Sequence, residues 1–346
     1  MKCWVKTARR VSLRPAGATF LVLLLFVLLL FGLLLFGSVA VAQQTTLRTQ
    51  SNVVLVPALV KDLQGGIVYG LEAKNFIVED DGVEQPMRLD EAPEGQPISL
   101  VVAIQRGRRA YAEFPRMQGL QAMLDPLFTP GTARVAVVEF DSQVELTRNF
   151  TKDATLVKDD LRNLQPGDGG ATILDAVEYS VNLLKKEPDD RLRVLLLISE
   201  TRDHGSQAKI DDTVAAIGQS NAVIYALAFS PALSNILDTG RGTNKKEEQP
   251  TIDILDLAYR TAQAMRKNVP STIASMTGGE YELFATRKKF DVRMNDFTNH
   301  LHSRYRLSFS PKTPHPGLHR IRVRLKDAGD ALVLARSSYW VEEARP

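Results

Sequence analysis

Residues 97–110, with the sequence PISLVVAIQRGRRA, decide how the rest of the chain is interpreted. Positions 98–104 are almost wholly apolar, which is typical of a strand buried on both faces of a parallel sheet. The strand is followed at positions 105–109 by the sequence QRGRR. Ligands of open α/β sheets usually lie at the carboxyl ends of the strands, so three arginines stand where a binding site is expected.

Further apolar runs along the chain predict the other strands of this sheet. They are RVAVVEF at 134–140, RVLLLIS at 193–199 and AVIYALAF at 222–229. Between them, apolar residues from Leu174 to Leu184 recur with spacings of 3, 4 and 3, which predicts one face of a helix. Buried strands that alternate with helices predict an α/β fold with a doubly wound, mostly parallel, Rossmann-like sheet.

Smaller patterns complete this α/β region. The segment FDSQVELTRNF at 140–150 predicts a strand that runs antiparallel to the strand before it. The segment STIASMTGGEYELF at 271–284 predicts a helix that ends at a glycine, followed by a last strand. Residues 230–251 are rich in Pro, Gly, Asn and charged residues and predict an exposed loop.

The segments on either side of the α/β region have the alternating pattern of β-strands. In the stretch KNFIVEDDGVEQPMRL, Asp81-Gly82 lies between apolar runs and predicts a hairpin turn. The N-terminal β unit at 52–95 is too small to bury much surface alone. We therefore expect the C-terminal strands at 305–346 to pack with it as a small β-sandwich, beside an α/β domain at 97–304.

Residues 1–42 have the features of an export signal. Five basic residues precede an apolar run at 20–36, and Ala40 and Ala42 follow in a small-x-small pattern. We predict cleavage after Ala42, a disordered lead-in at 43–51, and a location in the periplasm, at the cell surface or in the medium. An uncleaved membrane anchor is the alternative, since the apolar run is long for a signal, and membrane association is expected only in that case.

The charge of the chain depends on this segment. Residues 1–42 hold five of the 43 Lys and Arg residues and no acidic residue, so the remainder has 38 basic against 40 acidic residues and a net charge of −2. This balance excludes a strongly basic surface for nucleic acid. The single cysteine, Cys3, also lies in this segment, so the remainder has neither a disulfide nor a thiolate metal site.

Four segments, in order and spacing, resemble the VWFA-related domain proteins of the acidobacterial type. They are VVLVPALVKDLQGGIVYGLEAKNFIVEDDGVEQ at 53–85, VAVVEFDSQVELTRNFTKDATLVKDDLRNLQPGDGGATILDAV at 135–177, RVLLLISETRDHGS at 193–206, and the tail from YRLSFSP to SSYW at 305–340. The resemblance covers nearly all of the chain after residue 42. It implies an exported protein built around a von Willebrand factor A domain.

The resemblance also implies a metal-ion-dependent adhesion site, from which this sequence departs at every part. Such a site has Asp-x-Ser-x-Ser after the first strand, a Thr from a second loop and an Asp after a later strand, all hard oxygen ligands suited to Mg²⁺. The corresponding positions here are Gln105, Gly107 and Arg109, then Ala171 followed by Thr172, then Glu200. We predict a degenerate site with no metal and no cofactor, because ligands are lost and positive charge is gained.

The arginines suggest a replacement for the cation. We hypothesise that Arg106, Arg108 and Arg109 contact an acidic partner directly through guanidinium–carboxylate pairs, with Glu200 paired to one of them. The alternative is a solvated, charged loop that remains after the adhesion site decayed.

The expected function is that of a non-catalytic interaction or adhesion module for a protein or cell-envelope partner. Three alternatives stay open: metal-dependent adhesion through a site rebuilt from Thr172 and Glu200, a hydrolase that uses Glu200 with His204, and an envelope protein whose β unit is the working part. The pair His300 and His302 is interpreted as exposed polar residues rather than a metal site.

Overall fold

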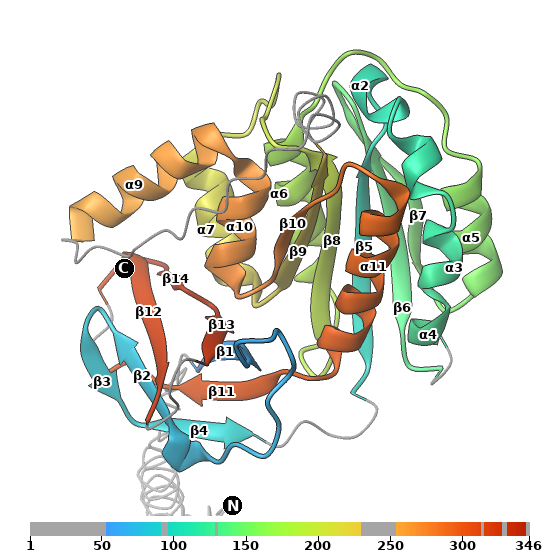
Figure 1. Cartoon of the computed structure of the whole chain (residues 1–346). Coiled ribbons are helices and arrows are strands. Elements are labelled where there is room, and N and C mark those ends of the chain that lie inside the picture. Colours follow the sequence, from blue (N-terminus) through green and yellow to red (C-terminus); the bar gives the residue numbers. More distant parts are fainter. Residues whose placement is uncertain are drawn as a thin grey trace, which may run out of the picture. The chain divides into compact units, whose positions relative to one another are not determined.

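A six-stranded sheet organises the larger part of the molecule (Figure 1). In spatial order its strands are β10 (Tyr281–Leu283), β9 (Val223–Phe229), β8 (Leu192–Glu200), β5 (Ile98–Gln105), β6 (Arg134–Phe140) and β7 (Val144–Thr151). All neighbours pair in parallel except β6 and β7, which are antiparallel. The predicted α/β fold class is confirmed.

The computed structural model describes residues 53–90, 96–128, 131–229, 254–312, 315–326 and 331–343. They belong to one compact unit that begins at residue 51. The predictions for the export signal at 1–42, for the lead-in at 43–51 and for the loop at 230–251 fall outside these residues. No helix within the described ranges is both long and apolar enough to cross a membrane.

Helices cover both faces of the sheet, so every residue of β5 is buried. One face, which includes Leu100 and Val102, packs against the first group of helices; the other, which includes Val101 and Ala103, packs against the second group. The first group is α2 (Arg108–Tyr111), η2 (Phe114–Met117), α3 (Leu120–Met123), α4 (Asp125–Phe128), α5 (Ala154–Arg162) and α11 (Arg287–Leu301). The second group is α6 (Ile173–Leu184), α7 (Ile210–Ser220), α9 (Ile254–Lys267) and α10 (Val269–Thr277).

Two four-stranded antiparallel sheets form the sandwich. The first has the order β13 (Leu332–Ala335), β1 (Val54–Lys61), β11 (Tyr305–Phe309), β4 (Met87–Asp90). The second has the order β14 (Ser338–Val341), β12 (Gly317–Leu325), β2 (Phe76–Asp80), β3 (Val83–Gln85), and a short helix, η1 (Ala73–Asn75), precedes β2. Both sheets contribute to one apolar core that includes Val56, Val78, Leu307 and Ile321.

In both sheets of the sandwich, N-terminal strands pair with C-terminal strands, as the fold prediction required. The C-terminal run ALVLARSSYW at 331–340 forms two strands in different sheets, β13 and β14. The exact domain boundaries stay a prediction.

Arg336, between β13 and β14, joins the sandwich to the α/β region. Its buried guanidinium donates hydrogen bonds to the Gly218 carbonyl, to Asn221 Oδ1 at 2.7 Å and to the Leu55 carbonyl at 3.2 Å. Burial lowers the pKa of Arg336 to about 10, which leaves the side chain charged at neutral pH. Arg336 Nε also donates to the Ser338 carbonyl at 2.8 Å, so one side chain connects α7 with strands of both sheets.

Glu280 makes a second connection. Its carboxylate is paired with Lys61 at the end of β1, and its Oε2 lies 2.6 Å from His300 Nδ1 in α11. Burial alone would raise the pKa of Glu280, but the hydrogen bonds from His300 and Lys61 outweigh burial and lower it to about 2. The prediction that both His300 and His302 are exposed is wrong for His300, which is buried in this ion-pair cluster.

Candidate functional site

Three loops meet near the carboxyl ends of β5, β6 and β8: one follows β5, one follows β6, and one at 167–172 leads into α6. Backbone hydrogen bonds join them: Arg106 N donates to Phe140 O at 2.8 Å, Gly167 N to Arg106 O at 2.8 Å, and Thr172 N to Asp141 O at 2.9 Å. The parallel order of these strands places their ends side by side, which is why residues far apart in sequence form one group.

Gln105, the last residue of β5, is paired with Glu200, the last residue of β8. The amide nitrogen of Gln105 donates to Glu200 Oε1 at 3.1 Å, and the amide oxygen accepts from the Glu200 backbone N–H at 2.9 Å. Both side chains are buried. The amide therefore forms hydrogen bonds with both the buried carboxylate and the buried backbone N–H of Glu200. An aspartate at position 105 would place a second carboxylate beside Glu200 and could not donate a hydrogen bond to it.

Arg109 supplies the positive charge for Glu200. Arg109 Nη1 lies 3.5 Å from Glu200 Oε2, and the arginine side chain is 65% exposed. His204 Nε2 lies 4.0 Å from the same carboxylate oxygen. The buried carboxylate is thus held from one side by an amide and faces a largely exposed guanidinium on the other.

Arg106 is engaged differently from Arg109. Its guanidinium lies 3.0 Å from Asp141 Oδ2, 3.2 Å from Glu139 Oε2 and 3.1 Å from Glu145 Oε2, and its side chain is 24% exposed. Burial opposes the charged form, but the carboxylates outweigh burial and raise the pKa of Arg106. Arg106 therefore holds β6 and β7 to the loop after β5. The side chain of Arg108, which begins α2, lies outside the described structure.

The second loop, at 167–172, closes tightly on the first. A Cβ atom added to Gly107 would lie 2.4 Å from the Gly170 carbonyl oxygen, and one added to Gly170 would lie 2.4 Å from the Ser142 backbone nitrogen. Asp168 accepts hydrogen bonds from Ser142 Oγ and from the backbone N–H groups of Ser142 and Gly170, and these bonds lower the pKa of Asp168. The space beside Gly107 is therefore filled by backbone.

Ala171 and Thr172 are both buried. Ala171 exchanges two backbone hydrogen bonds with His204, of 3.1 and 2.8 Å, and the Thr172 hydroxyl donates to the Asp141 carbonyl at 3.1 Å. The backbone N–H of Leu174, in the first turn of α6, donates to Asp203 Oδ1 at 3.0 Å. These contacts stabilise the start of α6 and engage the Thr172 hydroxyl with the backbone.

The residues at this end of the sheet do not fit a divalent-cation site. Gln105 directs an amide nitrogen at Glu200, Gly107 has no hydroxyl and no space for one, and Arg109 faces the carboxylate from the position of the second serine. A hard cation needs several converging oxygen ligands, and a guanidinium in their place repels it.

Residues 107–202 match the family model of the von Willebrand factor type A domain. This region is a von Willebrand factor type A domain. No curated protein matches the chain. The loops described above, at 105–109, 167–172 and 200–206, are called the adhesion-site loops below, after the positions that the resemblance assigns to such a site.

Three solved structures are distantly similar to the chain. BatB from Bacteroides thetaiotaomicron has 12% identity, with 59% of this chain and 98% of that chain covered, at a TM-score of 0.40. The vWF domain of the type V pili tip protein Mfa5 from Porphyromonas gingivalis has 10% identity, with 59% and 94% covered, at 0.38. Proximal thread matrix protein 1 from the mussel byssus, with a zinc-occupied MIDAS motif, has 13% identity, with 70% and 50% covered, at 0.42.

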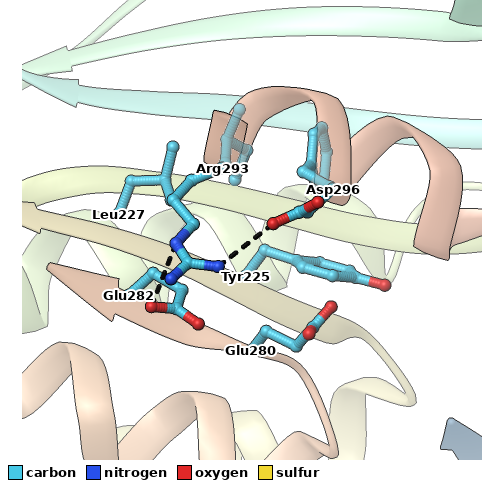
Figure 2. A pocket seen from close by; sticks show the side chains of 8 residues that line it. Tyr225, Leu227, Glu280, Glu282, Arg293 and Asp296 are labelled. Atoms are coloured by element: carbon cyan, nitrogen blue, oxygen red, sulfur yellow. Dashed lines mark hydrogen bonds and ion pairs between the residues drawn. The ribbon is translucent and has the colours of Figure 1, made fainter. Parts of the chain in front are cut away.

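A small cavity lies between the six-stranded sheet and α11. Figure 2 shows Arg293 between Glu282 and Asp296. Arg293 Nε lies 3.2 Å from Glu282 Oε2, and Arg293 Nη1 lies 3.1 Å from Asp296 Oδ2. Leu227, Tyr225 and Glu280 line the same cavity, whose volume of about 20 Å³ is room for about one water molecule. It is too small for a substrate, and none of its lining residues belongs to the adhesion-site loops.

The structure adds three carboxylates that the sequence interpretation did not include. Glu139, Asp141 and Glu145 surround Arg106, so this end of the sheet is a balanced ion-pair group rather than a positive patch. The signal for two of them was in the sequence, since Glu139 and Asp141 lie at the end of the apolar run at 134–140, next to β5 in the predicted sheet.

Proposed function

We propose that this chain is an exported, non-catalytic interaction module whose A domain contacts a protein or cell-envelope partner without a metal ion. The observation that supports this proposal most directly is the pairing of Glu200 with Gln105 and Arg109, which leaves the Arg109 guanidinium largely exposed. Export is supported by the basic head, apolar run and small residues of the first 42 residues.

Arg109 can do for a partner carboxylate what a cation does in a metal-dependent site. A guanidinium has five N–H donors in a planar fork, and the contact with Glu200 at 3.5 Å leaves most of them available. A bidentate pair with an incoming carboxylate needs two of these donors. We narrow the hypothesis of three contacting arginines to Arg109 among the described side chains, because Arg106 is already held by three carboxylates.

The non-catalytic part of the proposal is supported by the surroundings of Glu200. A general base must be free to accept a proton, but this carboxylate is hydrogen-bonded by Gln105 and faces Arg109. His204 is half-exposed and 4.0 Å away, beyond hydrogen-bond distance.

The metal-independent part is tested by calorimetric titration of the chelator-stripped full chain with Mg²⁺, Mn²⁺ and Ca²⁺. We expect no saturable heat at millimolar concentration with any of the three ions. Saturable binding that disappears in Glu200→Gln would overturn this part, because Thr172 and Glu200 would then rebuild a metal site, and metal-dependent adhesion would become the function.

The partner chemistry is tested with a glutamate-rich peptide as the probe. We expect salt-sensitive binding to the parent chain that weakens by about tenfold or more in Arg109→Glu, since an attractive contact becomes repulsive. Lys74→Glu, which makes the same charge change at an exposed position in the sandwich, serves as the matched control and should bind like the parent. Equal weakening in both variants, or in neither, would contradict a role for Arg109.

A further inference from the structure

A second group of ligand-type side chains lies in the sandwich, and the A domain loops contribute nothing to it. Asp81 is in the turn between β2 and β3, while His315 and His319 lie just before and within β12. The antiparallel pairing of β2 with β12 brings them together, since Asp81 N donates to the Arg320 carbonyl at 2.9 Å. Among the described residues this is the group of three whose candidate ligand atoms all lie within 4.8 Å of one another.

Both imidazoles direct a nitrogen at the same carboxylate oxygen. His319 Nδ1 lies 2.8 Å and His315 Nε2 lies 3.5 Å from Asp81 Oδ2. Ligands bonded to a tetrahedral zinc ion at about 2.0–2.1 Å are about 3.3 Å apart, so both separations are close to those of a coordination shell. The His319 side chain is only 2% exposed, and the rings of His315 and His319 stack with centroids 4.0 Å apart.

In each of the three side chains, the nitrogen or oxygen that points away from the group already makes a hydrogen bond, as the second atom of a metal ligand commonly does. His319 Nε2 lies 2.7 Å from the His315 carbonyl, and His315 Nδ1 lies 3.1 Å from the Pro316 carbonyl. In a neutral imidazole, a ring N–H that donates to a carbonyl leaves the lone pair on the other nitrogen, which here is the nitrogen that faces Asp81. Asp81 Oδ1 accepts the Arg320 backbone N–H at 2.9 Å, so Oδ2 is the oxygen that stays available.

The two imidazole nitrogens that face Asp81 make no hydrogen bond within the described structure. His315 Nε2 and His319 Nδ1 are buried atoms that lie within ion-pair distance of Asp81, yet neither makes a hydrogen bond of acceptable geometry within the described structure. His319 Nδ1 also lies 3.5 Å from Asp80 Oδ1, so this group of carboxylates needs a positive centre, which is either a proton on His319 or a metal ion bound by Asp81 and both imidazoles.

We propose that Asp81, His315 and His319 bind a zinc ion. Two imidazole nitrogens and one carboxylate oxygen are a donor set that zinc prefers over Mg²⁺ or Ca²⁺. The ion ties the segment that leads into β12 to the β2–β3 turn, and its role is structural, since these elements belong to one sheet.

The test is calorimetric titration of the tag-free, chelator-stripped full chain with Zn²⁺ at neutral pH, together with thermal unfolding with and without the metal. We expect one equivalent to bind and to raise the melting temperature. His315→Ala and Asp81→Asn should each weaken binding on the order of 100-fold and abolish the thermal shift. Asp81→Asn keeps a side-chain oxygen for the Arg320 N–H and tolerates the left-handed backbone of Asp81, at φ 48°, so its fold is preserved.

Two matched variants make the outcomes decisive. His302→Ala removes a histidine outside the group and should bind Zn²⁺ like the parent, while Glu200→Gln removes the carboxylate of the adhesion-site loops and should also leave binding unchanged. The proposal fails if the parent shows no saturable Zn²⁺ binding, as expected of a plain ion pair between Asp81 and a protonated His319. It fails equally if binding survives in both His315→Ala and Asp81→Asn, or depends on Glu200.

Discussion

At the scale of single residues, Glu200 is the buried carboxylate around which the adhesion-site loops are arranged. A buried carboxylate with no partner is costly by several kcal/mol, and here the Gln105 amide and the Arg109 guanidinium compensate it. The amide provides hydrogen bonds and the guanidinium provides the opposite charge. Gly107 is the third part of this arrangement, because its missing side chain lets the 167–172 loop close on the site.

The close approach at Gly107 predicts the effect of one methyl group. In Gly107→Ala the new Cβ would lie 2.4 Å from the Gly170 carbonyl oxygen, and backbone cannot turn away as a side chain does. We expect a loss of about 1–3 kcal/mol in the free energy of unfolding, measured with urea. Gly169→Ala is the control, because its Cβ meets no atom within 4 Å, and it should change stability by less than about 0.5 kcal/mol. Equal stability of the two variants would show that the loops are not closely packed.

At the scale of elements, the molecule depends on contacts between segments that no local pattern links. Glu280, just before β10, is held by Lys61 of β1 and by His300 of α11. A strand of the sandwich, the edge of the six-stranded sheet and the last helix therefore meet at one carboxylate.

This carboxylate predicts how stability responds to acid. The pKa of Glu280 is lowered from 4.5 to about 2, so its contribution is fully present above pH 4.5 and is lost as the pH falls toward 2. The lowered pKa of Glu280 corresponds to a contribution of about 3 kcal/mol to the free energy of unfolding at neutral pH. Urea unfolding at a series of acidic pH values should show this loss in the parent and a flatter profile in Glu280→Gln. Glu84→Gln, an exposed control in β3, should keep the parental profile, and a parental profile in Glu280→Gln would contradict the assignment.

At the scale of the whole molecule, Arg336 connects the sandwich and the α/β region. Its donors serve α7, β1 and β14 at the same time, and a Cβ added to Gly218 of α7 would lie 2.6 Å from Trp340 Cβ. The two regions are in direct contact here. The contact depends on the buried Arg336 guanidinium, whose hydrogen bonds are all accepted by backbone or amide oxygens.

Loss of this side chain should therefore weaken the molecule as a unit. In Arg336→Ala several buried acceptors lose their donor, and we expect a loss of about 3 kcal/mol or more in the free energy of unfolding. Arg336→Lys should restore little of the lost stability, since one ammonium group cannot reach acceptors on three elements. Arg324→Ala removes an exposed arginine paired with Glu79 and should cost less than about 1 kcal/mol. Similar unfolding midpoints for the Arg336 and Arg324 variants would contradict the linking role.

Much of the fold was predictable from local patterns. The apolar run at 98–104 became β5, buried along its whole length, and the period of the residues from Leu174 to Leu184 became α6. Asp81-Gly82 formed the expected turn, since both residues have the positive φ that this hairpin requires. These outcomes depend on burial and backbone preference, which are encoded within a few residues.

The sequence predicted where the candidate site lies but not how its side chains are arranged. The sequence by itself determined that Gln105, Arg106, Arg109 and Glu200 stand at the carboxyl ends of neighbouring strands, because parallel order follows from the alternation of strands and helices. Tertiary structure alone decided that Arg106 is held inside by carboxylates of β6 and β7 while Arg109 is exposed. It also decided that Asp81 meets two histidines more than two hundred positions away, through the register of β2 on β12. The physical reason is the same in both cases: electrostatic contacts depend on distances of a few ångströms between side chains, and strand pairing sets those distances without regard to separation along the chain.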